Sequence, residues 1–271
     1  MNGILWATFI LSAASYVTSA GLFVSQSRRK PTAHGRTAWP PRVLELGAVL
    51  HLSYLILFSV MDRRCPVYSL HSALGIISLV GVVTYAVLSR SRRLPALGGF
   101  VAATAAVFLV AAHSIAVRPP STNDRWLMAV HITSNFLGGG IVLVAGCAAA
   151  FYIWSERRLR MRRSLGVGPK LPPLESLDAV VHRLLWIGLP LLTIGIFSGR
   201  LVIKHAEVVT AGDRVRAMLS IGSWLVLLAV LLLRQFSSWR GRRPAYVALA
   251  GALGILLVIM LYVGRAMFGV G

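Results

Sequence analysis

The chain has 271 residues, of which 56% are hydrophobic and 13% are charged. Soluble globular proteins average about 45–50% apolar and about 25% charged residues, so this composition excludes an ordinary water-soluble globule. A formal net charge of +20 is also typical of nucleic-acid binders, but here the basic residues fall between long apolar runs. This distribution favours the lipid bilayer over nucleic acid as the partner.

Eight apolar runs, each bounded by charge or proline, follow one another along the chain. A helix rises about 1.5 Å per residue, so about 20 apolar residues cross the hydrocarbon core of a bilayer. Because helices satisfy their backbone polar groups within the segment, the runs predict an all-α polytopic membrane bundle of eight transmembrane helices. The predicted spans are 4–24, 43–61, 69–89, 97–117, 127–153, 184–203, 215–233 and 244–264.

The connections between the spans differ in basic charge. Most of the 28 Lys and Arg residues fall after the first, third, fifth and seventh spans. Lys and Arg are retained on the cytoplasmic side of a membrane, so these connections are predicted to be cytoplasmic. We therefore expect both termini on the outer side of a bacterial cytoplasmic (inner) membrane.

The longest connection, residues 155–183, ends in an amphipathic segment. Apolar residues recur at helical spacing from Leu174 to Val181, and a charged face runs from Glu175 to Arg183. This pattern predicts a short cytoplasmic interfacial helix that leads into the sixth span.

Histidines at membrane depth are candidates for chemistry because ionisable groups are costly in a bilayer. The predicted topology places His71, His113 and His131 about 3 to 7 Å below the outer boundary, at about 1.5 Å per residue. His205 falls just beyond the outer end of the sixth span. Two neutral imidazoles from separate helices can hold a haem iron, whereas a lone membrane histidine more often makes an interhelical hydrogen bond. Because these histidines share one predicted depth, the hypothesis that two of them ligate a haem iron is modestly favoured.

His51 and two glycine motifs lie inside predicted spans. An unpaired imidazole near the centre of a span is expensive, so His51 is expected to bond to Ser53 or to another helix, or to form a second ligand site. The run Gly138–Gly140 disfavours a helix by about 1 kcal/mol per glycine and predicts a close neighbour, either a helix or a flat ligand. Gly195 and Gly199 have the spacing of closely packed helices.

Enzyme signatures are missing from the sequence. The chain has no Walker loop, no His-Glu-x-x-His, no nucleophile elbow and no paired intramembrane carboxylates. We therefore expect a protein that binds and presents a ligand without catalysis.

Three stretches in the second half of the chain carry a resemblance to a known family. The first is Trp126-Leu-Met-Ala-Val-His131, the second runs from Leu171 to Gly199, and the third is Ser238-Trp-Arg-Gly-Arg-Arg-Pro-Ala-Tyr. Together they resemble the cytochrome c assembly proteins, haem-handling membrane proteins that include the CcsA, CcmC and HemX-like groups. The first stretch is similar to an outer segment in which a tryptophan precedes a ligand histidine. The resemblance implies two parts: residues 1–124, with four spans, and residues 125–271, with four spans that resemble the cytochrome c assembly domain.

Two features of the family are missing. Its haem-handling members have a tryptophan-rich motif in the outer loop before the seventh span, and residues 200–214 contain no tryptophan. The second outer histidine near the end of the last span is also missing. His205 is the expected substitute as a ligand, and Arg200, Lys204 or Arg265 are expected to pair with haem propionates.

The resemblance implies an integral membrane protein of cytochrome c biogenesis that binds or presents haem at the outer face. Its implied partners are other cytochrome c assembly proteins or an apocytochrome. One alternative is a non-haem scaffold or accessory subunit that kept the fold but lost the cofactor site. Another is a transporter for a small anionic solute, with an entrance at Arg200, Lys204 and Arg214. The candidate cofactor-binding residues are His131, His205, His113, His71 and Trp126, with His131 and His205 as metal ligands.

Overall fold

The computed structural model describes residues 2–28, 39–62, 70–91, 95–115, 125–160, 173–204, 210–237 and 241–268. All regular structure in these ranges is helical, which confirms the all-α prediction. The helices, in chain order, are α1 (Asn2–Arg28), α2 (Trp39–Asp62), α3 (Leu70–Ser91), α4 (Pro95–His113), α5 (Arg125–Arg160), α6 (Leu174–Lys204), α7 (Ala211–Ser237) and α8 (Arg242–Phe268).

Seven of the described helices are long and apolar enough to cross a membrane. The eighth, α4, has a shorter apolar stretch, Leu97–His113. The protein is therefore a multi-pass membrane protein, with its helices in the predicted order. α5 has 36 residues and, at about 1.5 Å per residue, extends well beyond about 30 Å of hydrocarbon. Its basic last turn therefore continues past the predicted end of the span.

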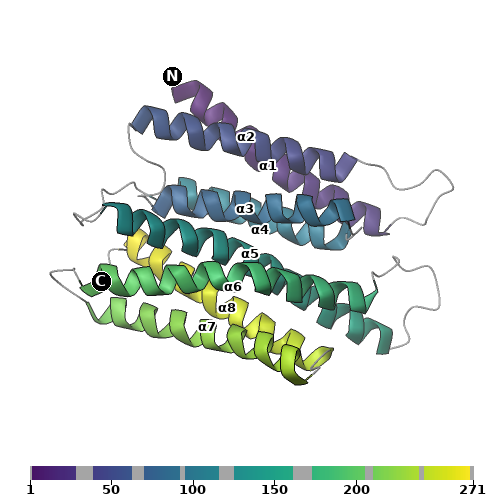
Figure 1. The fold of residues 1–271 in the computed structure, drawn as a ribbon. Coiled ribbons are helices and arrows are strands. Elements are labelled where there is room, and N and C mark those ends of the chain that lie inside the picture. The colour runs from purple at the N-terminus through teal and green to yellow at the C-terminus, as the bar shows by residue number, and fades with distance from the viewer. Residues whose placement is uncertain are drawn as a thin grey trace.

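The helices run antiparallel to their sequence neighbours, and both chain ends lie at the same end of the bundle (Figure 1). We call this the termini end, where α1 begins and α8 ends. The arginine end is the opposite one, where α5 ends in Arg157, Arg158 and Arg160 and where α6 begins. α1 packs against α2 and α4, and α3 packs against α4. α5 packs against α6 and α8 on one side and against α3 and α4 on the other. It therefore lies between two groups of four helices, α1–α4 and α5–α8.

Two neighbouring helices pack closely against the glycine run of α5. A Cβ on Gly138 would lie 2.8 Å from the Leu192 backbone nitrogen of α6, and one on Gly140 would lie 3.1 Å from the Ile77 carbonyl oxygen of α3. Only a residue without a side chain permits these approaches. Of the two explanations that the sequence offered for the glycine run, the structure therefore shows neighbouring helices.

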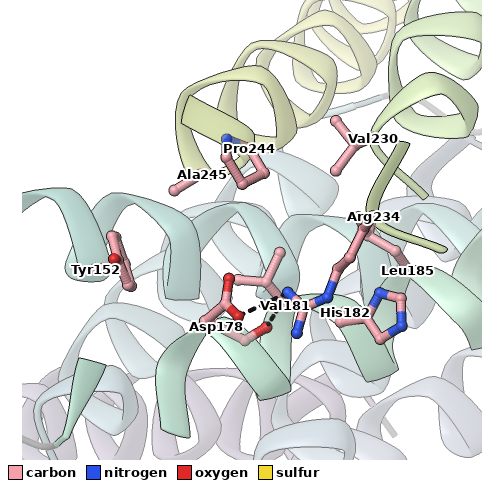
Figure 2. A pocket seen from close by; sticks show the side chains of 9 residues that line it. All are labelled: Tyr152, Asp178, Val181, His182, Leu185, Val230, Arg234, Pro244 and Ala245. Carbon is pink, nitrogen blue, oxygen red and sulfur yellow. Dashed lines mark hydrogen bonds and ion pairs between the residues drawn. The ribbon is translucent and has the colours of Figure 1, made fainter. Parts of the chain in front are cut away.

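The predicted interfacial segment is helical, but it continues into the sixth span without a break, as the first turns of α6. Its apolar residues Leu177 and Val180 are buried in the core. Asp178 forms an ion pair with Arg234 of α7 at 2.8 Å, and Figure 2 shows this pair between the two helices. The cavity beside the pair measures only about 10 Å³, which is room for about one water molecule. The segment therefore anchors α6 to α7.

Candidate functional site

Two predicted ligands, His71 of α3 and His113 of α4, meet at Tyr54 of α2. The Tyr54 hydroxyl lies 3.1 Å from His71 Nε2 and 2.9 Å from His113 Nδ1. His71 Nδ1 lies 2.8 Å from the Ala112 carbonyl oxygen, which only accepts, so Nδ1 carries the proton. Tyr54 therefore donates to His71 Nε2 and accepts from His113 Nδ1. Both ring nitrogens of His71 are used in hydrogen bonds.

Aromatic rings enclose the same two histidines. The His113 ring stacks on Phe9 with centroids 4.0 Å apart and meets the edge of Trp6 at 4.6 Å. The His71 ring stacks on Phe58 at 4.1 Å. These contacts fit the interhelical hydrogen-bond interpretation of both residues.

His51 is fully buried on α2 and bonds to another helix, as one of its sequence-based interpretations states. Its Nδ1 lies 3.1 Å from the Tyr16 hydroxyl of α1. The Ser53 hydroxyl instead donates to the Val49 carbonyl of its own helix. His51 Nε2 is buried without a hydrogen-bond partner among the described residues, and it lies 3.4 Å from where a Cβ on Gly75 would be.

His131 of α5 packs against the glycines of α6. Its Nδ1 lies 2.7 Å from the Gly195 carbonyl oxygen, so Nδ1 carries the proton and Nε2 keeps its lone pair. A Cβ on Gly199 would collide with the imidazole ring, and a Cβ on Gly195 would lie 2.5 Å from the Asn135 side chain. The Gly195/Gly199 motif thus makes room for side chains of α5 as well as for a helix.

His131 lines a cavity of about 290 Å³ between α3, α5, α6, α7 and α8. This volume lies at the lower limit of small-molecule sites, which measure about 300–1,000 Å³. The wall is mostly aliphatic, and its other polar groups are Asn135, Ser220 and Tyr262. Ser220 and Tyr262 were not predicted, because no local motif marks them. The apolar part of a ligand fits this lining.

A charged cluster adjoins the cavity at the start of α7. Thr210 and Asp213 form a capping box: Thr210 donates from its backbone N–H to Asp213 Oδ2 at 3.0 Å, and the Asp213 N–H donates to Thr210 Oγ1 at 3.2 Å. Asp213 Oδ1 accepts from Arg216 and, at 3.0 Å, from Arg265 of α8. The Arg216 guanidinium lies over the Tyr262 ring, 4.8 Å from its centroid. Of this cluster only Arg265 was singled out from the sequence, and the structure places it on Asp213.

The remaining predicted site residues lie away from the cavity or outside the described ranges. Trp126 is 71% exposed at the start of α5 and does not line the cavity. His205 falls within residues 205–209, which lie outside the described ranges, so its pairing with His131 stays a prediction. Among the residues that the structure describes, no three His, Cys, Asp or Glu side chains form a potential metal site.

Comparison with known proteins gives a consistent result. A sequence model of the family described as "Cytochrome C assembly protein" matches residues 42–267, so the match includes most of α2 and all of α3 and α4 as well as the second half. The chain is 29% identical to "Cytochrome c biogenesis protein CcsA" of Guillardia theta over 56% of its own length and 54% of the relative's. It is 23% identical to the protein of the same name from Parasynechococcus marenigrum (strain WH8102), over 89% and 87%.

A third relative is "Inner membrane protein YpjD" of Escherichia coli (strain K12), 28% identical over 48% of each chain. The chain thus aligns with only about half the length of two of these three relatives. No solved structure matches it.

Proposed function

The chain belongs to the cytochrome c assembly protein family, and on that premise we propose that it acts in cytochrome c biogenesis by binding haem and presenting it at the outer face of the membrane. The observation that carries this proposal is His131, whose Nε2 lone pair is left available on the wall of an apolar cavity. Haem, when bound, supplies an iron that accepts an imidazole ligand.

The surroundings of His131 match those of metal-binding histidines. Such residues usually donate their other ring N–H to a carbonyl or carboxylate, which fixes the tautomer and the ring orientation. Gly195 provides that carbonyl at 2.7 Å, and Gly199 leaves the ring its space. His131 is thus held ready as a ligand before any haem arrives. His205 is our expected second ligand.

The proposed membrane is the bacterial cytoplasmic membrane, with the termini end on the outer side. Basic residues support this orientation, because Arg157, Arg158 and Arg160 of α5 lie at the arginine end, as do Arg242 and Arg243 of α8. His131 lies in the second turn of α5, close to the termini end, so a haem bound there would be accessible to an outer apocytochrome or assembly partner.

We propose binding and presentation without turnover. The residues that line the cavity include no acid, lysine, cysteine or arginine within the described ranges, and His131 is the only titratable base among them. Tyr262 and Ser220 are suited to hydrogen bonding with a ligand.

A non-haem scaffold is the second candidate. It is favoured by His71, whose ring nitrogens are both used within the helix bundle, and by the tryptophan-free segment 200–214. Such a protein would keep the bundle and contact another membrane protein.

Haem absorbance distinguishes the haem-binding protein from the scaffold. We expect purified full-length protein in detergent to bind haem with a Soret band that shifts on reduction, and His131→Ala to lose that band while expression is retained. His182→Ala is the matched control, because His182 lies at the arginine end and accepts from Trp186 of its own helix. A colourless wild type that co-purifies with a fixed partner would instead establish the scaffold.

A further inference from the structure

Arg216 is a buried cation that shares its carboxylate partner, among the described residues, with a second arginine. Its side chain is 6% exposed, and its Nε has no hydrogen-bond partner among the described residues. Asp213 pairs with Arg216 but is shared with Arg265, so the three groups together carry one excess positive charge. A buried N–H without a partner is costly, and Arg216 and Arg265 share one carboxylate, which indicates that a further anionic acceptor belongs beside Arg216.

The position of Arg216 relates that anion to the cavity. Arg216 lies one turn before Ser220, whose hydroxyl donates to the Arg216 carbonyl at 2.8 Å, and its guanidinium covers the ring of Tyr262. Ser220 and Tyr262 both line the cavity. The cationic group and the apolar space are therefore adjacent parts of one site.

We propose that this site binds an amphiphilic carboxylate, with its apolar body in the cavity and its carboxylate on Arg216. Asp213 and Tyr262 position the guanidinium, and Arg is suited to the task because its planar fork matches a carboxylate. The inference rests on the proposed function where the ligand is haem, whose ring carries two carboxylates. A fatty acid of the membrane is the other source of the same chemistry.

Arg216 suits this role better than Arg265, although both pair with Asp213. The Arg265 side chain is 40% exposed, and exposed ion pairs contribute little because solvent screens them. The burial of Arg216 makes its pairing with a carboxylate stronger. The preference for a carboxylate is therefore assigned to Arg216.

The test compares hemin with its dimethyl ester, which lacks the free carboxylates, and adds a fatty acid as a carboxylate with a different apolar body. Purified full-length protein in detergent is titrated with hemin, with hemin dimethyl ester and with a fluorescent long-chain fatty acid. We expect the wild type to bind hemin at least about tenfold more tightly than the ester, as a hydrogen-bonded charged pair would give. Arg216→Gln should remove this difference, and Arg216→Lys should retain part of it.

Two further variants separate the contributions. His131→Ala should weaken the binding of hemin and of its ester alike and leave the ratio of their two affinities unchanged. Arg183→Gln is the matched control: it removes an exposed arginine from the arginine end of α6, and it should change no affinity. Elution as a single species and helical circular dichroism establish that each variant is folded, and the wild-type ratio is informative without any variant.

The outcomes are distinguishable. Equal binding of hemin and its ester by the wild type overturns the inference but leaves the haem function standing, and so does an unchanged ratio in Arg216→Gln. If neither porphyrin binds but the fatty acid does, and Arg216→Gln weakens it, the haem function fails and the carboxylate site stands. Binding of none of the three probes overturns both.

Discussion

The two groups of four helices, α1–α4 and α5–α8, differ in the groups that surround their histidines. In α1–α4, His51 and His71 are buried against tyrosine hydroxyls, and ring nitrogens are used to join neighbouring helices. In α5–α8, glycines surround His131, one ring nitrogen is bound by a backbone carbonyl and the other remains available on a cavity wall. A histidine at membrane depth thus becomes structural or ligand-like according to the side chains that face it.

The two groups also differ in what holds them together. Polar contacts between helices of the first group are mainly tyrosine–histidine and serine–carbonyl hydrogen bonds, whereas the second has ion pairs such as Asp178–Arg234. If this contrast is correct, charge removal should disrupt the second group more than hydroxyl removal disrupts the first.

The largest expected effect follows from Asp178→Ala, which leaves the Arg234 guanidinium, 13% exposed, without its counter-ion and with the carbonyl oxygen of residue 178 as its remaining acceptor. Breaking a buried pair costs about 3–5 kcal/mol, so the thermal midpoint in detergent should fall strongly. Glu175→Ala is the control on the same turn, because Glu175 is exposed and should change stability by less than about 0.5 kcal/mol. Equal losses in the two variants would contradict the assignment of the pair.

A smaller effect is expected from Gly199→Ala. The new Cβ collides with the His131 ring, and such overpacking costs about 1–3 kcal/mol. The displaced ring should also weaken haem binding in a Soret titration. Gly222→Ala on α7 is the matched control: a Cβ there meets nothing within 4 Å, and the change should be neutral or stabilising by up to about 1 kcal/mol. Unaltered haem binding in Gly199→Ala would remove His131 from the site.

Tyr54→Phe tests the first group of helices. It removes the hydroxyl between His71 and His113 and should cost about 1–3 kcal/mol, because both imidazoles lose the hydrogen bond to that hydroxyl. Haem absorbance should persist, because His131 has no part in this contact. Loss of the Soret band without unfolding would show that the first group contributes a ligand.

The smallest effect is expected from Trp126→Ala. Its ring is exposed, so stability should change by less than about 0.5 kcal/mol. A haem titration of the same variant tests the expectation that the Trp126 side chain contacts the porphyrin ring of haem. From its place outside the cavity wall we expect affinity to stay within about threefold, since a threefold change is only about 0.7 kcal/mol.

The sequence was sufficient for the order of the helices, because each apolar run carries its own length and boundaries. It also indicated the glycine contacts of α5, since a tri-glycine helix segment is unfavourable without a close neighbour. It predicted that the segment from Leu174 to Arg183 is helical and leads into the sixth span, but not that its apolar face is buried in the core, because amphipathicity is the same whether that face meets lipid or helices.

The site was harder to predict, since it depends on how each helix is rotated about its axis. Depth alone placed His71, His113 and His131 in one layer, but rotation directs the first two to Tyr54 and the third to Gly195. Arg216 and Tyr262 lie on different helices, and no periodicity within α7 or α8 indicates that they stack.

The glycines of α5 have a mechanical consequence. Gly138 packs closely against α6, and Gly140, two residues further along α5, packs closely against α3. Because an α-helix rotates as a rigid body, any rotation of α5 about its axis would strain both contacts together. A shift of α6 at its contact with Gly138 would therefore also strain the contact of α3 with Gly140.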